Sequence, residues 1–259
     1  LGCCRLIYNK GLAMRNEAYQ NGSKIGYSQT STMLTELKKQ DDFVFLKVVD
    51  SIALQQSLRD LDRGFVNFFQ KRARHPQFKS KHNRHQSYRT INQSNNIRIV
   101  GKYIKLPKLG YVKVRQSMEV GKINNVTIEH TPTGKYFAVL NIEFEPQPMN
   151  NKGGKIGIDV GIKEFYSDSN GNEVPNPKYL EKSMRKLMRE QRKLSRKEKG
   201  SKNRNKQRVK VALVHEKITN QRNDFLQNES TKLIRENQTI YIEDLKVKNM
   251  MRNHKLAQH

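Results

Sequence analysis

The spacing of the apolar residues changes along the chain, and this change limits the folds that the sequence can adopt. In the first part, Leu54, Leu58, Leu61 and Phe65 recur at intervals of four, three and four, which is the spacing of one face of a helix. From residue 90 to residue 145 the interval shortens to two, as in strands with one buried face. Since helices, strands and a further helical stretch follow one another, we predict a multidomain protein of mixed α+β and α/β class.

The middle region reads as several short antiparallel strands. A turn is expected at Pro107–Gly110, and a hairpin connection is expected at Thr131–Gly134, because proline and glycine are typical of tight turns. Short strands of even spacing predict a small antiparallel β-barrel. Residues 71–89, which are rich in Lys, Arg and His, form a basic connector that leads into this barrel.

The last region combines strands with a long basic stretch. Residues 156–160 and 239–242 are apolar and read as strands, while residues 178–210 hold fifteen Lys or Arg and only three Glu. Apolar residues in and after this stretch keep a helical spacing, which predicts an antiparallel helical hairpin at about residues 177–237 in an α/β layer domain. We therefore expect three domains, at residues 1–72, 73–150 and 151–259.

Net charge points to a polyanionic partner. The chain has 50 Lys and Arg against 24 Asp and Glu, a formal net charge of +26, which favours nucleic acid, although charge alone is also compatible with a ribosome-like protein without catalysis. No apolar run approaches the ~18 residues of a membrane span, and no secretory signal pattern is present, so we expect a soluble, cytoplasmic protein. The adjacent Cys3 and Cys4 suit neither a disulfide framework nor a zinc site and are interpreted as buried residues.

Two acidic residues follow strand-like segments, Asp159 in KIGIDVG and Glu243 after IYI. Each alone could be structural, Asp159 as a turn residue and Glu243 as the partner of a basic side chain. Together, on neighbouring strands, two carboxylates could hold Mg²⁺ or Mn²⁺ for phosphodiester cleavage, and the glycines at 157 and 161 could allow a ligand to approach closely. Asp244 is expected on the opposite face.

The basic connector mixes cations with aromatic rings. Charged side chains could bind phosphates while rings stack on bases, or the stretch could be a solvated surface. The candidate nucleic-acid-binding residues are Lys79, Lys81, Arg84, Arg89, Phe78 and Tyr88. The nearby His75, His82 and His85 have no matching Cys or His pair and are interpreted as polar surface rather than as zinc ligands.

Seven segments, in order along nearly the whole chain, resemble the signature stretches of TnpB proteins. These are OrfB-type proteins of bacterial insertion sequences, similar to the ancestors of the type V CRISPR effector nucleases. The segments are GCCRLIYNKGLA, LQQSLRDLDRGFVNFF, HPQFKSK, IKLPKLGYVKV, IGIDVGIKEFYSDSNG, KITNQRNDFL and IYIEDLKVKNMMRNHKLA.

The resemblance implies a transposon-encoded, RNA-guided DNA endonuclease located with the bacterial nucleoid. Its helical recognition module would be residues 1–72, its wedge barrel residues 73–150, and residues 151–259 would be part of a RuvC-like nuclease domain of the RNase H fold. Asp159 and Glu243 match the first and second catalytic acids of the family, which use Mg²⁺. A guide RNA from the transposon end and target double-stranded DNA are the implied partners.

The family pattern extends beyond this sequence at both ends. Relatives begin with a basic strand before the GCCR segment and continue, past the segment HKLA, into a zinc ribbon with paired Cys-x-x-Cys motifs and a third catalytic Asp. We therefore expect a chain truncated at both ends, with zinc only in the missing ribbon and with no cleavage activity of its own. The alternatives are a nuclease-dead RNA-guided DNA-binding protein and an inert decayed fragment.

Overall fold

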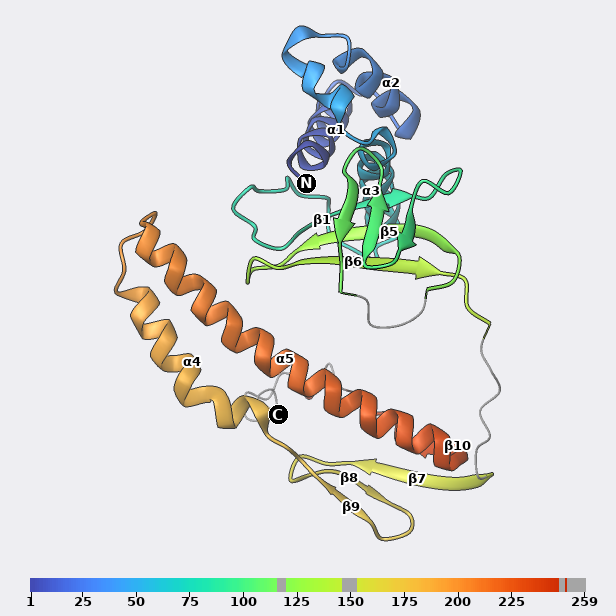
Figure 1. Ribbon diagram of the computed structural model, residues 1–259, viewed down its shortest axis with the longest axis vertical. Coiled ribbons are helices and arrows are strands. Elements are labelled where there is room, and N and C mark those ends of the chain that lie inside the picture. The colour runs from blue at the N-terminus through green and yellow to red at the C-terminus, as the bar shows by residue number, and fades with distance from the viewer. Residues whose placement is uncertain (116–119, 146–152, 247–249, 251–259) are drawn as a thin grey trace. The chain divides into compact units, whose positions relative to one another are not determined.

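A computed structural model describes residues 1–115, 120–145, 153–246 and 250, and it divides the chain into two compact units (Figure 1). The first unit comprises residues 1–145 and the second residues 146–259. Each unit has its own hydrophobic clusters, so each is described by itself.

The first unit begins with four helices. The apolar stripe predicted from the sequence lies on α3, where Leu54, Leu58 and Leu61 are fully buried against α1. Gly11 of α1 permits this close packing, because a Cβ atom there would lie 2.8 Å from Leu58 Cδ2. The helices are α1 (Gly2–Gln20), α2 (Tyr27–Leu37), the 3₁₀ helix η1 (Asp41–Val48) and α3 (Ser51–Phe69).

The carboxylate of Asp50 helps to connect the helices to the strands that follow. Asp50 is the N-cap of α3, and its Oδ1 accepts a hydrogen bond from the Ile52 amide at 3.0 Å, which satisfies one of the unpaired amides of the first turn. Its Oδ2 accepts from the hydroxyl of Thr90, a buried residue of the first strand. Tyr88 of the same strand packs against the helical cluster. The helices and strands therefore share one unit, and a domain boundary at residue 72 stays a prediction.

Six strands complete the first unit and form two antiparallel sheets, ordered β1-β5-β6 and β2-β3-β4. The predicted hairpin at Thr131–Gly134 joins β5 to β6, with Gly134 at φ +83, a conformation that glycine adopts without steric cost. The predicted turn at Pro107–Gly110 joins β3 to β4. The strands are β1 (Gln86–Ile91), β2 (Arg98–Val100), β3 (Tyr103–Leu106), β4 (Gly110–Lys113), β5 (Ile123–His130) and β6 (Tyr136–Ile142).

The predicted barrel is wrong in its closure, because the described strands form two separate sheets that share a core. Ile97, Ile104 and Val126 meet between the sheets. Asn92 makes the corner between them: its side chain accepts from the Ile97 amide at 2.8 Å and donates to the Ile97 and Ile123 carbonyls at 2.9 and 2.8 Å. These hydrogen bonds hold the chain where it leaves β1 for β2, and the described strands of the two sheets stay in separate hydrogen-bonded groups.

The second unit contains a four-stranded sheet of order β10-β7-β8-β9, in which β10 is parallel to β7 and the other pairs are antiparallel. Ile156, Ile158 and Tyr166 are buried on one face, where Leu233 of the last helix packs against them. The strands are β7 (Gly154–Val160), β8 (Glu164–Asp168), β9 (Glu173–Pro175) and β10 (Asn237–Ile242).

The predicted helical hairpin is present as α4 (Tyr179–Ser195) and α5 (Lys202–Glu236), which run side by side in Figure 1. Leu187 of α4 packs against Val214 and Ile218 of α5. Closer to the tip, the Gln207 amide donates to Glu190 Oε2 at 2.7 Å, and this hydrogen bond lowers the pKa of Glu190.

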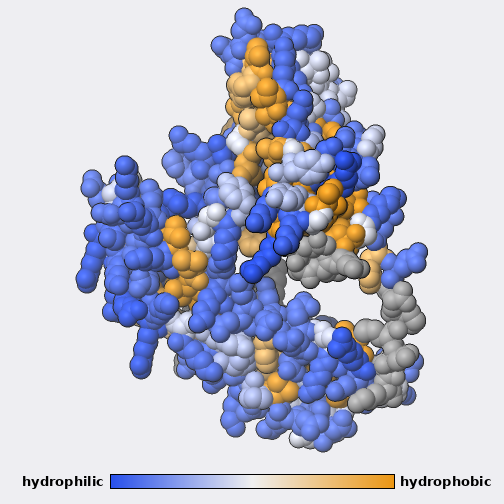
Figure 2. All heavy atoms as spheres, in the orientation of Figure 1, coloured by the Kyte–Doolittle hydropathy of each residue, from blue (hydrophilic) through white to orange (hydrophobic). Residues whose placement is uncertain are grey.

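The surface seen in Figure 2 is mostly hydrophilic, with hydrophobic residues gathered in separate patches. In the part of the chain that the structure describes, no helix combines the length and the apolar character that a membrane span requires.

Candidate metal-binding and nucleic-acid-binding sites

The parallel pair β7 and β10 positions the two candidate acids. Its last registered partners are Ile158 and Ile242, and the next residue on each strand is acidic, Asp159 on β7 and Glu243 directly after β10. Residues in register on parallel neighbouring strands lie on the same face of the sheet. Continuing this register by one residue would set the two predicted acids opposite each other on one face of the sheet, and both residues are exposed.

A β-bulge in β10 produces this alignment. Asn237 is paired with Gly154, but Thr239 is paired with Lys155, so one extra residue of β10 lies between two consecutive partners. Without the extra residue, Glu243 would be opposite Val160 and would point to the other face, because side chains alternate along a strand. Bulges are common beside active sites, where they redirect a side chain.

The hydrophobic core fixes which face carries the acids. Ile156 and Ile158 alternate with Gly157 and Asp159 along β7, and the two isoleucines are buried against Ile240 and Leu233. A shift of one residue would expose the isoleucines and bury a carboxylate, which is costly when the charge is unpaired. Burial on one face therefore holds Asp159 on the opposite, open face.

The two flanking glycines serve the strand and its turn. A Cβ atom at Gly161 would lie 2.9 Å from the Glu164 carbonyl oxygen, so the tight turn into β8 requires glycine there. A Cβ atom at Gly157 would meet only Ser169 Cβ at 3.6 Å, an ordinary contact, and the Gly157 amide donates to Ser169 Oγ at 3.1 Å. At Gly161 the backbone of Glu164 approaches closely, and the approach of a ligand at either glycine stays a prediction.

In the described part of the chain, the side chains of Asp159 and Glu243 form no hydrogen bond and no ion pair. Asp168 of β8 is a further acid on the sheet, but it accepts hydrogen bonds from Asn172 and Asn170, and these lower its pKa. It is paired with Ile158, so it lies on the other face. Among the described residues, no three His, Cys, Asp or Glu are grouped as metal ligands.

Two carboxylates of this kind fit a hard divalent cation, because ionised carboxylates are acceptor-only oxygen groups that Mg²⁺ and Mn²⁺ prefer. They supply part of a coordination shell and leave room for water and for phosphate oxygens. The roles of Asp159 and Glu243 as metal ligands stay a prediction.

The candidate residues of the basic connector lie in two kinds of surroundings. Arg89 donates to Asp60 Oδ1 at 2.8 Å and to Gln56 Oε1 at 3.2 Å, and burial raises the pKa of Tyr88 to about 12. Lys79 lies against α1, with its Nζ 4.1 Å from the centre of the Tyr8 ring, and desolvation lowers its pKa. These three side chains are held by the helices.

Other connector residues face solvent. Phe78 is 58% exposed and Lys81 is exposed, while Arg84 is half-buried and has a partner of its own. An exposed ring near an exposed cation suits the binding of single-stranded nucleic acid. The assignment of all six connector residues to nucleic acid stays a prediction.

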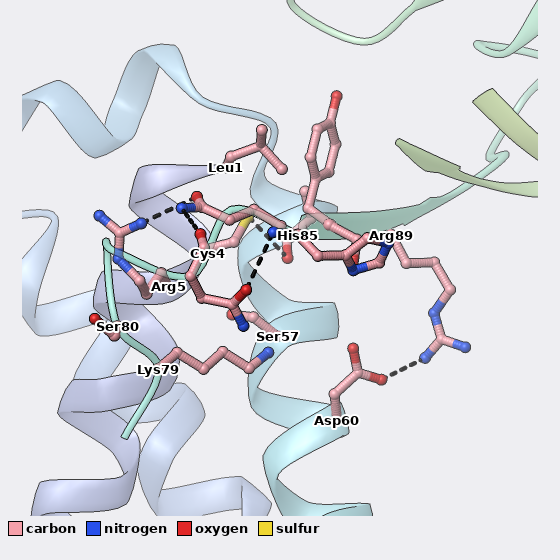
Figure 3. Close-up of a pocket in the computed structure, with 14 residues that line it drawn as sticks. Leu1, Cys4, Arg5, Ser57, Asp60, Lys79, Ser80, His85 and Arg89 are labelled. Atoms are coloured by element: carbon pink, nitrogen blue, oxygen red, sulfur yellow. Dashed lines mark hydrogen bonds and ion pairs between the residues drawn. The ribbon is translucent and has the colours of Figure 1, made fainter. Parts of the chain in front are cut away.

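Between the helices and the connector lies a cavity of about 160 Å³ (Figure 3). Its polar wall is a hydrogen-bonded chain in which Arg5 donates to Gln86 Oε1 at 3.0 Å and Gln86 donates to the Asn83 carbonyl at 2.8 Å. Cys4 forms part of the apolar wall, and burial raises the pKa of its thiol to about 11. A thiol that stays protonated at neutral pH is a poor nucleophile, which agrees with the interpretation of Cys4 as a buried residue.

Rings and cations also alternate on β3 and β4, outside the stretch that the sequence singled out. Tyr103, Lys105, Tyr111 and Lys113 occupy every second position of the two strands. The sequence shows aromatic or basic residues at every second position of these two segments. Only the pairing of β3 with β4 shows that the four side chains share one face of the sheet.

Comparisons with known proteins agree with the resemblance found in the sequence. Residues 126–254 match the family model OrfB_IS605, described as "Probable transposase", and residues 1–24 match HTH_OrfB_IS605, described as a helix-turn-helix domain. The chain is 40% identical over 99% of its length to a Streptomyces pristinaespiralis protein named "Putative RNA-guided DNA endonuclease", and covers 64% of it. It is 36% identical over 97% of its length to the Escherichia coli protein "Putative RNA-guided DNA endonuclease InsQ", and covers 63% of it.

A shorter match concerns the Salmonella dublin protein named "Virulence protein VsdF", which is 37% identical over 31% of the chain. The chain spans just under two thirds of the length of the first two relatives.

Proposed function

Since the chain belongs to the TnpB (OrfB-type) family of insertion-sequence transposases, we propose that it is part of an RNA-guided DNA endonuclease. In this proposal a guide RNA pairs with target DNA and carries the sequence information, while the protein binds backbone and shape. The formal net charge of +26 suits two polyanionic partners.

The observation that carries the proposal is the parallel register of β7 and β10, which ends at Ile158 and Ile242, one residue before Asp159 and Glu243. The two acids belong to segments separated by the whole helical hairpin, and the register that follows the bulge in β10 supports a position of both on the open face of the sheet. Two neighbouring carboxylates repel each other unless a cation lies between them. We therefore propose that they hold Mg²⁺ or Mn²⁺.

A divalent ion in this position supplies the positive charge that stabilises the leaving oxygen of a phosphodiester. The protein's own contribution is to fix the ligands. Ile156 and Ile158 are buried in the core and fix the position of the β7 backbone at Asp159. Ile240 packs against them and fixes the β10 backbone that leads to Glu243. Because both carboxylates are exposed, a nucleic acid strand can reach the same face.

Metal binding by charge-neutral variants tests the proposal. Asp159→Asn and Glu243→Gln should each weaken Mn²⁺ binding, measured by calorimetry, by about tenfold or more, because each removes one anionic ligand from the site. Asp244→Asn is the matched control, since it removes the same charge from the next residue and should leave the affinity within about twofold. Unchanged Mn²⁺ affinity in both site variants would refute the assignment.

A second function, guided DNA binding without cleavage by this chain, is favoured by one observation. Only two acids converge in the described residues, and no group of three candidate ligands is present there. Two-metal cleavage needs ligands for both ions, so we expect guide-dependent DNA binding with no detectable cutting. Guide-dependent cutting that Asp159→Asn abolishes would instead show that two acids from this chain suffice.

A further inference from the structure

The outward face of the sheet β2-β3-β4 combines aromatic rings with cations. In the antiparallel register, Tyr103 is opposite Lys113 and Lys105 is opposite Tyr111. The intervening Ile104 is buried in the core between the sheets, so alternation turns the other residues outward. The tyrosine–lysine face is defined by Arg98, Tyr103, Lys105, Tyr111 and Lys113.

The two rings of this face are accessible. Tyr103 is 46% exposed and Tyr111 is 56% exposed, and neither ring forms an aromatic or cation–π pair with another described residue. They are diagonal neighbours across β3 and β4, a relation that places side chains about 7–8 Å apart. Two accessible rings beside cations on one strand pair form a surface on which flat groups can stack.

The charge around the face is positive and uncompensated. Residues 63–118 hold 14 Lys or Arg and no Asp or Glu, so no acid lies on or between the three strands. Within the described parts of the chain, no ion pair involves Arg98, Lys105 or Lys113. An anionic partner with flat groups is the complement of such a face.

We propose that the tyrosine–lysine face binds single-stranded RNA, with bases stacked on Tyr103 and Tyr111 and phosphates bound by Lys105 and Lys113. Aromatic rings on a sheet stack unpaired bases, while a duplex keeps the faces of its bases covered. The choice of RNA over single-stranded DNA rests on the proposed function. The face belongs to the first unit, whereas Asp159 and Glu243 belong to the second.

Substitution of the rings tests the stacking. The double variant Tyr103→Leu/Tyr111→Leu should weaken binding of a fluorescein-labelled oligouridylate by about ten- to a hundredfold. The double variant with Phe should restore most of the affinity, because phenylalanine keeps a ring. Tyr136→Leu is the matched control, since Tyr136 is 66% exposed on β6, in the other sheet, and should not change the affinity. Circular dichroism checks that each variant is folded.

Substitution of the lysines tests the phosphate contacts separately. Lys105→Gln/Lys113→Gln should reduce the slope of log affinity against log salt by about 1.4, which corresponds to two phosphates of a single strand. The leucine variants should leave this slope unchanged, because they remove no charge.

An engineered tryptophan reports stacking directly, because the chain contains no Trp. Tyr111→Trp should show fluorescence quenching with single-stranded RNA and little with an RNA duplex of equal charge, while Tyr136→Trp should respond to neither. Polyglutamate and single-stranded DNA serve as competitors.

Three results would overturn the proposal: no loss of affinity in the leucine double variant, equal loss on duplex RNA, or equal competition by polyglutamate. Equal competition by single-stranded DNA would overturn the choice of RNA. All measurements are made in chelator without divalent metal, so a failed metal site and a failed RNA face give different results.

Discussion

Arg89 offers a way to separate a structural role from a nucleic-acid role by measurement. Its guanidinium lies 2.8 Å from Asp60 Oδ1 and 3.2 Å from Gln56 Oε1, and these two partners lie on α3. The side chain is 26% exposed, so most of it is already withdrawn from solvent. We expect Arg89 to attach β1 to α3, although composition alone places it among residues that bind phosphate.

The magnitude follows from the two contacts. Asp60 is 41% exposed, so solvent screening limits the ion pair to about 1 kcal/mol. Gln56 is buried, and loss of its charged donor leaves an amide oxygen unsatisfied, which costs about 1 kcal/mol more. Arg89→Met, which keeps the length of the side chain, should therefore lower the free energy of unfolding of the first unit by about 2 kcal/mol.

Urea unfolding followed by circular dichroism measures this loss, and RNA binding at rising salt measures the charge contact. Arg89→Met should shift the urea midpoint and leave the salt slope unchanged. Lys81→Met is the matched control because Lys81 is exposed; it should leave the midpoint unchanged and reduce the slope by about 0.7. A double-mutant cycle with Asp60→Asn should give a coupling of about 1 kcal/mol.

The opposite pattern would refute this reasoning. If Arg89→Met kept the unfolding midpoint and lost RNA affinity with a smaller salt slope, the guanidinium would contact phosphate and its pairing with Asp60 would be incidental.

Two further predictions concern the second unit. Gly161→Ala should lower the free energy of unfolding of the second unit by about 1–3 kcal/mol and weaken Mn²⁺ binding, because the new Cβ would lie 2.9 Å from the Glu164 carbonyl oxygen. Gly157→Ala is the control, and equal effects of the two substitutions would contradict this argument. Burial and the hydrogen bond to Glu229 raise the pKa of Tyr166 from 10.0 to about 12. The neutral hydroxyl therefore stabilises the folded state below pH 10, and this contribution to stability is lost as the pH rises through 12. Tyr166→Phe should reduce the loss of stability over that range in urea midpoints, and an unchanged pH profile would show that other groups cause it.

Periodicity predicts elements that depend on nearby residues. The stripe of Leu54, Leu58 and Leu61 and the hairpin turn at Thr131–Gly134 were readable because their signals lie within a few residues. Barrel closure was not, since it depends on how sheet edges meet, and the side-chain hydrogen bonds of Asn92 set that corner. Alternation of apolar residues is the same in a barrel and in two facing sheets.

The candidate sites show the same limit. The order of strand, hairpin and strand suggested that Asp159 and Glu243 could meet, and the register of β7 and β10 ends at Ile158 and Ile242, one residue before each acid. Their role as metal ligands stays a prediction. The orientation of the connector side chains could not be read from the sequence, because the partners of Arg89 lie about 30 residues away on α3. A run of cations has the same composition whether its members face water, a helix or a phosphate.

The position of Glu243 depends on where α5 ends. The helix passes directly into β10, and the Asn237 side chain donates to the Leu233 carbonyl at 3.1 Å, which ties the start of the strand to the last helical turn. Leu233 is itself packed in the core of the sheet, so the first residue of β10 has little freedom to slide. Counted from that fixed start without interruption, Glu243 would be one residue out of phase with Asp159. The bulge between Asn237 and Thr239 absorbs this one residue, which places the second acid on the open face while Ile240 stays in the core. The helical hairpin, the bulge and the apolar face of the sheet therefore together determine the register that leads to the two carboxylates.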